Sequence, residues 1–284
     1  MNYIKLMRVK HYIKNLLIFL PLLFSGLMLE KSKLITTIFG FICFSFIASS
    51  IYIINDIKDM KSDRNHKTKC NRPIASGKIR PINAIIFMIF LLFIVTIICI
   101  FMKFNIISIL LILLYFILNI CYSMGAKNIP LVDVIILVSG FVIRVLFGAS
   151  LIGINVSNWL YLTVISASFY LGLGKRRNEL MKSKKTRHVL KYYNKEFLDK
   201  NMNAFMTMTI IFYSLWTTDY EIVSKSNNLL IWTVPFLIII LLKYSMDIEG
   251  NSDGDPVEVI VKDKILLALG MVYGIAMLLI LYIV

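Results

Sequence analysis

The sequence predicts an all-α membrane protein, a single bundle of nine transmembrane helices with a cytoplasmic amino-terminus and a carboxy-terminus outside. Of the 284 residues, 58% are hydrophobic, whereas soluble domains average about 45–50%. The excess falls in blocks long enough to cross a hydrocarbon core of about 30 Å, and lipid offers no water to an unpaired backbone, so such blocks favour helices. The loops between the blocks alternate between strongly basic and nearly neutral. Together these observations exclude a soluble globular domain.

Nine apolar blocks follow one another along the chain. They lie at about 15–29, 34–54, 82–102, 105–122, 131–153, 157–174, 203–220, 228–246 and 264–284. The fifth block contains Arg144, the sixth is rich in small residues and tyrosine, and the seventh is rather polar, so we expect these three to face a cavity inside the bundle. No separate soluble domain stands out, and residues 1–284 are predicted to form one membrane-embedded domain.

Loop charge predicts the orientation. The loops dense in Lys and Arg are the amino-terminus, 55–81 and 175–202, and the short, nearly neutral connectors lie near 30–33, 103–104, 154–156 and 221–227. Because basic loops stay in the cytoplasm, the basic set is predicted to lie inside, and the loops 123–130 and 247–263 then fall on the same side. This gives an amino-terminus inside and a carboxy-terminus outside, and an odd number of spans requires the two termini to lie on opposite sides, so the two observations agree.

The net charge of +15 would suggest nucleic acid in a soluble protein. In a membrane protein, cytoplasmic loops and anionic headgroups explain most of it, and a phosphate-rich substrate would use the same charges. We therefore expect no nucleic-acid partner. The four cysteines (Cys43, Cys70, Cys99 and Cys121) have no metal-binding spacing, and disulfides are not expected. The basic amino-terminus leads into a first membrane helix, since no cleavage site of a signal peptide stands out.

The strongest chemical signal is the segment Asn55–Asp63, directly after the second apolar block. On a helix, Asp56, Asp59 and Asp63 would share one face at positions i, i+3 and i+7. Carboxylates at this spacing repel each other unless a cation lies among them, and Mg²⁺ joins such oxygens to substrate phosphates. The segment therefore predicts a magnesium site, against the alternative of a solvated loop with acids scattered among bases.

Basic residues follow these acids at once, from Arg64 to Lys78, and would donate to phosphate oxygens. The dipeptides Arg72-Pro73 and Ser76-Gly77 predict turns. His66 stands alone here, and we expect it to form a loop hydrogen bond rather than to bind metal.

Asn55–Asp63, followed by Arg72-Pro73-Ile74-Ala75-Ser76-Gly77, resembles the first aspartate-rich motif of the UbiA superfamily of membrane transferases. The resemblance implies a nine-helix bundle with a Mg²⁺–diphosphate site at the cytoplasmic end of a lipid-accessible cavity. The second motif of the superfamily is only partly matched, by Tyr122, Lys127 and Asp133. Leu137 stands where a second aspartate is expected, which argues against an ordinary prenyl-diphosphate enzyme.

Further segments along nearly the whole chain resemble one branch, the decaprenyl-phosphate phosphoribosyltransferases. They are Lys10–Asn15, Ser139–Arg144 with Gly148-Ala149, Gly174–Leu180, Leu190–Tyr193, Leu242–Tyr244 with Asp247, and Gly254–Glu258 with Asp263. This resemblance implies transfer of 5-phosphoribosyl from phosphoribosyl diphosphate (PRPP) to a polyprenyl phosphate, with release of diphosphate. The product would serve as a precursor of arabinose donors for cell-wall glycans, in the plasma membrane of a prokaryote, with the active site facing the cytoplasm.

The resemblance also implies roles for single residues. Asp56, Asp59 and Asp63 would hold Mg²⁺, with Asn55 orienting them. Asp133 would face the developing ribosyl cation, bind a ribose hydroxyl or hold metal. The cations expected for the 5-phosphate and the lipid phosphate are Lys14, Arg72, Lys78, Lys127, Arg144, Lys175 and Arg176, and Asn55 and Tyr122 complete the substrate-binding set. The acceptor is already an anion, so no strong general base is needed.

Some of these residues have structural alternatives. A charge within an apolar block should face the bundle interior with a partner. Asp133 is too far along the same helix to be the partner of Arg144, which favours a substrate for Arg144. Arg176 could instead pair with Glu179 at i+3. The bases Lys182, Lys184, Lys185 and Arg187 are expected to face headgroups, and the acids of 247–263 to play a structural part.

Two other functions stay open. A UbiA-type prenyltransferase would use a prenyl diphosphate and a small acceptor, and Leu137 argues against it. A transporter would more typically show polar interruptions in mid-span and inverted repeats, whereas here the charges gather at one membrane face. An assembly of several identical copies is also left open.

Overall fold

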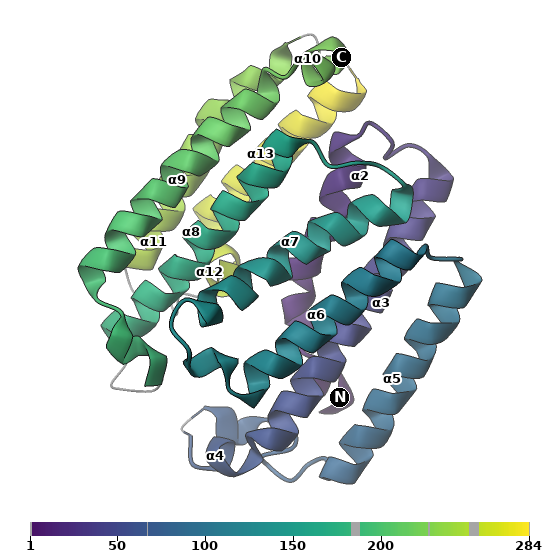
Figure 1. Cartoon of the computed structure of the whole chain (residues 1–284), viewed down its shortest axis with the longest axis vertical. Helices are drawn as coiled ribbons and strands as arrows, with labels where there is room; N and C mark the ends of the chain where they lie inside the picture. Colours follow the sequence, from purple (N-terminus) through teal and green to yellow (C-terminus); the bar gives the residue numbers. More distant parts are fainter. Residues whose placement is uncertain (1, 67, 183–187, 227, 250–255, 284) are drawn as a thin grey trace. The chain divides into compact units, whose positions relative to one another are not determined.

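The computed structural model describes residues 2–66, 68–182, 188–226, 228–249 and 256–283. Within these ranges every regular element is a helix (Figure 1). The chain divides into two compact units: residues 1–22, 27–124 and 143–154 form the first, and residues 23–26, 125–142 and 155–284 form the second. The prediction of an all-α protein is confirmed.

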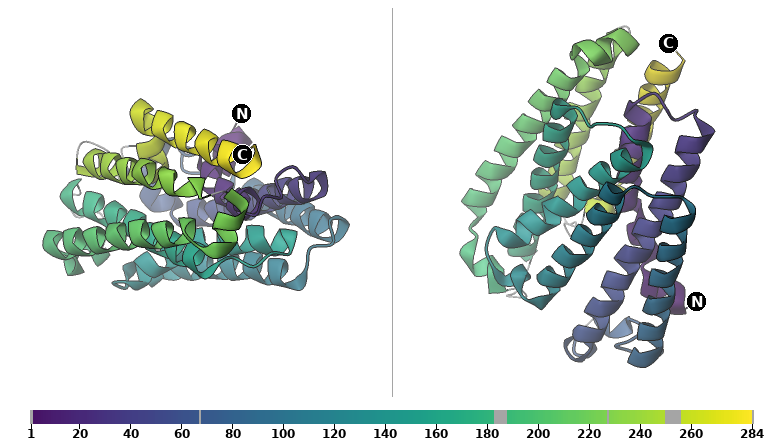
Figure 2. Two further views of the ribbon diagram at one scale, coloured as in Figure 1. Left: turned by 90° about the horizontal axis from the view of Figure 1, so that it is seen from above. Right: turned by 45° about the vertical axis from the view of Figure 1, so that its right-hand side comes forward.

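The first unit is built around α3. Its helices are α1 (Asn2–Met7), η1 (Val9–Phe19), α3 (Lys31–Lys58), α4 (Met60–Arg64), η2 (Lys69–Asn71), α5 (Pro81–Phe101) and α6 (Ile106–Met124), with the second half of α7 (Val132–Ile152). Helix α3 packs beside α5, as Figure 2 shows, and also against α1, η1 and α6. Small residues let helix backbones approach closely. Where α7 crosses η1, a Cβ on Gly148 would lie 2.1 Å from the carbonyl oxygen of Ile18. The core of this unit therefore depends on glycine at a helix crossing.

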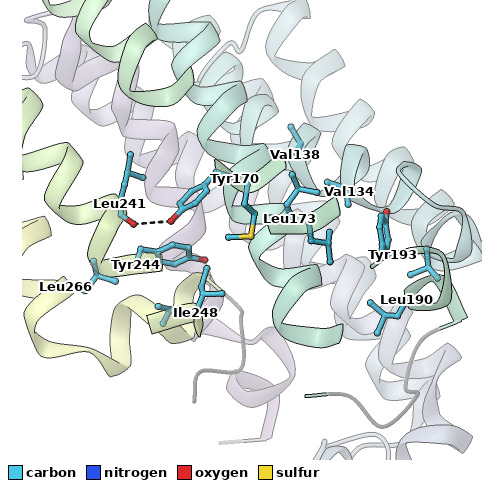
Figure 3. Packing of buried hydrophobic residues seen from close by; sticks show 14 residues of the cluster. Val134, Val138, Tyr170, Leu173, Leu190, Tyr193, Leu241, Tyr244, Ile248 and Leu266 are labelled. Atoms are coloured by element: carbon cyan, nitrogen blue, oxygen red, sulfur yellow. Dashed lines mark hydrogen bonds between the residues drawn. The ribbon is translucent and has the colours of Figure 1, made fainter. Parts of the chain in front are cut away.

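The second unit is a layer of long helices around α8 and α9. It contains η3 (Ala126–Asn128), the first half of α7, α8 (Asn158–Lys182), η4 (His188–Tyr192), α9 (Lys195–Thr217), α10 (Tyr220–Ser226), η5 (Leu229–Thr233), α11 (Val234–Glu249), α12 (Pro256–Lys262) and α13 (Lys264–Tyr282). A short helix, α2 (Leu20–Phe24), straddles the boundary between the units. Figure 3 shows the apolar core in which Tyr170 of α8 donates to the carbonyl oxygen of Leu241, at 3.0 Å.

Each of the nine predicted blocks falls on helical structure, but fewer than nine helices meet the requirements for a span. In the described residues, six helices are long and apolar enough to cross a membrane: Lys31–Lys58, Pro81–Phe101, Ile106–Met124, Val132–Ile152, Leu229–Glu249 and Lys264–Tyr282. The first block is divided between the 3-10 helix η1 and the five-residue helix α2, which ends at Phe24, and α8 and α9 carry polar ends. An integral membrane protein is supported, while the nine-span count and the orientation stay predictions.

The basic segment 175–202 was expected to be a loop, and this is wrong for most of its described length. Helix α8 continues to Lys182, and α9 begins at Lys195, where the Asn194 side chain accepts from the backbone N–H of Phe197 at 2.7 Å. The helix continues because its arginines are buried against acids: Arg177 pairs with Asp199 and lies 3.6 Å from Glu249. Of the expected headgroup-facing bases, Lys184, Lys185 and Arg187 lie outside the described residues, as do Gly254 and Asp255.

Candidate functional site

The aspartate-rich segment spans the end of one helix and the start of the next. Helix α3 ends at Lys58, and Asp59 (φ −87°, ψ 3°) joins it to α4. The path stays nearly helical, because the N–H of Asp63 donates to the carbonyl oxygen of Asp59 at 2.8 Å. Asp56 and Asp63 are almost completely buried, and Asp59 is half-buried. The expected helical spacing therefore brings two of the three carboxylates into the interior.

Arginines neutralise these two carboxylates. The Nη1 of Arg72 lies 3.1 Å from Asp56 Oδ1 and 2.6 Å from Asp63 Oδ2, so one guanidinium joins both acids. Arg8, from the amino-terminal segment, donates to the same Asp56 oxygen through Nη2. Arg72 was predicted from the sequence, whereas Arg8 was missed, because no local pattern links residues that are 48 positions apart.

The donor set fits Mg²⁺ that is shared with a phosphate ligand. Among the described residues, no three His, Cys, Asp or Glu side chains gather closely enough to form a complete metal site. Mg²⁺, however, is usually bound by one or two carboxylates while substrate phosphates and water complete its octahedron. The Asp56 and Asp63 oxygens supply such a pair, and Asp59 adjoins them in the chain.

Asn55 ties this segment to the end of α6. Its Oδ1 accepts from the hydroxyl of Ser123, and the Nζ of Lys58 donates to the Ser123 carbonyl oxygen at 2.5 Å. Tyr122, the neighbour of Ser123, is half-buried. These contacts fix the carboxy-terminal end of α3, and with it the position of Asp56.

The remaining cationic candidates of the first unit lie in different surroundings. Lys14 is half-buried in η1, and Lys78 is exposed in the turn after Gly77, whose φ of 76° suits glycine. Arg144 is buried, and its Nε donates to Asn15 Oδ1 at 2.8 Å, while its Nη2 donates to the Tyr115 hydroxyl at 3.0 Å. The expectation that Arg144 faces the interior with a partner is confirmed, and its role toward substrate stays a prediction.

A second charged cluster lies in the other unit. Asp133 and Arg176 are completely buried, with the Arg176 Nε 2.5 Å from Asp133 Oδ2. Arg176 also pairs with Glu179, at 2.6 Å, so the expected i+3 contact is present, and the role of Arg176 toward substrate stays a prediction. Lys127 in η3 and Lys175 in α8 are half-buried. The cluster leaves Asp133 with a cationic partner from a different helix.

Tyr193 completes this cluster and was not predicted as a site residue. Its hydroxyl donates to Asp133 Oδ1 at 2.7 Å and accepts from the N–H of Leu131 at 2.8 Å. Leu131 has a φ of 66°, a conformation that costs a bulky residue energy. Tyr193 therefore holds both the strained start of α7 and one oxygen of Asp133. The resemblance over Leu190–Tyr193 was the only sequence signal that pointed to it.

Replacement of Tyr193 by phenylalanine tests this contact through its pH dependence. Burial and, next, the hydrogen bond to Asp133 raise the pKa of Tyr193 to about 12. The neutral form is favoured in the folded state, so its contribution is complete below pH about 10 and is lost as the pH rises through about 12. We expect Tyr193→Phe to lower the free energy of unfolding by about 1–2 kcal/mol at pH 8, and by progressively less above pH about 10.

Thermal unfolding of both proteins in detergent between pH 8 and pH 11.5 measures this difference. Tyr192→Phe is the matched control, because Tyr192 is exposed beside Tyr193, and it should leave the midpoint unchanged. A gap between wild type and Tyr193→Phe that stays constant over the whole range would contradict the prediction.

Three comparisons bear on the identity of the chain. The model of the UbiA prenyltransferase family matches residues 18–256. The chain is 29% identical to the decaprenyl-phosphate phosphoribosyltransferase of Corynebacterium glutamicum, over 96% of this chain and 85% of that protein. It is also 29% identical to the protein of the same name from Mycolicibacterium smegmatis, over 93% and 87% of the two chains.

Solved structures agree with the fold. A UbiA homologue from Archaeoglobus fulgidus bound to DMAPP and Mg²⁺ superimposes with a TM-score of 0.71 at 21% identity, over 98% of this chain and 99% of that one. The same homologue bound to GPP and Mg²⁺ gives the same score and coverage. At this identity the likeness shows the fold alone.

Proposed function

The chain belongs to the UbiA prenyltransferase family and is a membrane enzyme of that kind, and we propose that it transfers 5-phosphoribosyl from PRPP to a polyprenyl phosphate that resembles decaprenyl phosphate. The observation that carries the proposal is the match to decaprenyl-phosphate phosphoribosyltransferases over 96% of the chain. The missing second aspartate, at Leu137, supports the same reaction over a prenyl-diphosphate one.

In the proposed reaction, the bond from the anomeric carbon of the ribose to the diphosphate oxygen breaks, and diphosphate leaves with the electron pair. An oxygen of the lipid phosphate forms the new bond to that carbon. The lipid phosphate is already ionised, so no proton has to be removed from the nucleophile. This agrees with a site made of carboxylates and guanidinium groups rather than of a Ser-His-Asp arrangement.

Asp56 and Asp63 would hold Mg²⁺ together with Asp59, and Asn55 would keep the end of α3 in place. Bound Mg²⁺ would offset the charge that develops on the leaving diphosphate. Arg72, which contacts both buried carboxylates, would donate to phosphate oxygens beside them. Asp133 would face the developing ribosyl cation, bind a ribose hydroxyl or hold metal, and Arg176 is a candidate cation for the 5-phosphate or the lipid phosphate.

The proposed reaction also implies a location in the cell and a use for its product. The enzyme would lie in the plasma membrane of a prokaryote as nine spans, with the site facing the cytoplasm, where PRPP is soluble. The phosphoribosylated lipid would be consumed by reactions that build cell-wall glycans. An apolar groove open to the bilayer would receive the polyprenyl tail, as the lipid-soluble acceptor requires.

Transfer of labelled ribose 5-phosphate from PRPP to a polyprenyl phosphate, with purified protein and Mg²⁺, tests the proposal. We expect a lipid-linked label that disappears with a chelator and with Asp59→Ala. Turnover of a prenyl diphosphate with a small acceptor, without any transfer from PRPP, would overturn it in favour of the reaction that the ligands of the Archaeoglobus fulgidus structures suggest.

A further inference from the structure

Arg8 occupies an unusual position between α1 and η1. Its backbone is left-handed, with φ 53° and ψ 48°, a conformation that a non-glycine residue adopts only where its surroundings enforce it. The structure shows what enforces it. Leu6 is completely buried, and the Met7 carbonyl oxygen accepts from the Ser49 hydroxyl of α3 at 3.0 Å.

The side chain of Arg8 is held against the same helix. Its guanidinium carbon lies 4.7 Å from the ring centroid of Tyr52, and its Nη2 donates to Asp56 Oδ1. Tyr52 and Asp56 lie four residues apart on α3, on neighbouring turns of one face. The strained turn at Arg8 therefore directs a guanidinium to the innermost carboxylate of the aspartate-rich segment.

The formal charge of this cluster and the solvent exposure of its arginines indicate how it would respond to a cation. Two guanidinium groups, from Arg8 and Arg72, face two buried carboxylates, so the cluster is formally neutral. The carboxylates are 2% and 4% exposed, but Arg8 and Arg72 are 22% and 26% exposed. A divalent cation bound by the carboxylates must share the Asp56 oxygen with Arg8 or displace it, and the cluster then carries two surplus positive charges.

We propose that Arg8 is a phosphate-binding residue of this site, and that it competes with the divalent cation for Asp56 Oδ1. When the cation binds, the guanidinium of Arg8 turns to the phosphate oxygens of the diphosphate, where a planar fork can donate two hydrogen bonds. The inference rests on the magnesium–diphosphate site of the proposed function. It adds the amino-terminal segment to that site.

Two binding titrations on purified protein test the proposal: Mn²⁺ alone, followed by electron paramagnetic resonance of the free ion, and inorganic pyrophosphate in saturating Mg²⁺, followed by calorimetry. For Arg8→Gln we expect tighter binding of Mn²⁺, because a competitor is removed, and about tenfold weaker binding of pyrophosphate, the loss expected for one charge-assisted hydrogen bond. These opposite shifts distinguish an exchanging guanidinium from a structural one.

Arg80→Gln is the matched control, since it removes one charge from an exposed arginine at the start of α5, and both affinities should equal those of wild type. Arg8→Lys keeps the charge without the fork, and it should give intermediate pyrophosphate affinity even if Arg8→Gln fails to fold. Unchanged pyrophosphate affinity, or weaker Mn²⁺ binding, in the folded Arg8 variants would overturn the proposal.

Pyrophosphate is a part of both PRPP and prenyl diphosphates. The binding test of Arg8 can therefore succeed or fail independently of the experiment that identifies the transferred group.

Discussion

Asp56→Asn is expected to lower the transfer of ribose 5-phosphate from PRPP by about 10²–10³-fold, because metal-assisted charge neutralisation supplies several kcal/mol and each 1.4 kcal/mol is a factor of about ten in rate. Asparagine keeps the size of the side chain and removes its charge. Asp56 is the carboxylate at which both guanidinium groups meet. With a neutral acceptor there, Arg8, Arg72 and Asp63 carry a surplus positive charge, which disfavours a cation.

The same variant should bind Mn²⁺ at least about tenfold more weakly than wild type, since it loses the charge of a carboxylate that is proposed to bind the metal. Initial rates and Mn²⁺ titrations on one preparation measure the two effects together. Asp199→Asn is the matched control, because Asp199 is a carboxylate paired with an arginine outside the aspartate-rich segment, and its transfer rate should stay near that of wild type. If Asp56→Asn kept a third or more of the wild-type rate, the role of Asp56 in holding metal would be refuted.

Arg176→Met is expected to lower the free energy of unfolding by about 3–5 kcal/mol, the cost of leaving one partner of a buried ion pair uncompensated. Both side chains of the pair are completely buried, and the Arg176 Nε lies 2.5 Å from Asp133 Oδ2. After the substitution, Asp133 keeps the hydrogen bond from the Tyr193 hydroxyl but no cation among the described residues, and Glu179 loses a contact of 2.6 Å. Thermal unfolding in detergent, with wild type alongside, measures the loss.

A double variant separates the fold from the chemistry. Asp133→Leu with Arg176→Met replaces the whole pair by apolar groups, and such replacements are often close to neutral for stability. Because Tyr193 and Glu179 each lose a partner in this variant, we expect it to unfold above the midpoint of Arg176→Met but below that of wild type, and to have lost transfer. Lys200→Met is the matched control, because Lys200 and Glu196 form an exposed pair at 2.8 Å, and such pairs contribute about 0–1 kcal/mol. An Arg176→Met protein that unfolds at the wild-type midpoint would show that the ion pair does not stabilise the fold.

The number of membrane spans illustrates a limit of reading hydropathy along a chain. Apolar blocks identify helices well, because lipid requires every backbone group to be bonded within the segment, and each of the nine blocks overlaps a helix in the described part of the chain. Whether a block crosses the membrane depends also on its length and on its partners. Arg176 and Arg177 extend α8 beyond its apolar part because acids from other segments bury them.

The sequence by itself determined the helical membrane class and the local part of the site. Asp56, Asp63 and Arg72 lie within 17 residues of one another in the chain, so helical spacing and a following turn are enough to predict their proximity. The pair of Arg176 and Glu179 follows from the same periodicity. Contacts of this kind depend only on the geometry of one turn of helix.

The tertiary structure alone decided which distant groups meet these residues. Arg8 reaches Asp56 across 48 positions, Arg176 reaches Asp133 across 43, and Tyr193 reaches Asp133 across 60. Arg144, which no local acid could neutralise, finds Asn15 and Tyr115 on other helices. Helical periodicity specifies the face on which a side chain lies, but the helix that covers this face is set by how side chains pack between helices, and a single sequence carries no local signal of that packing.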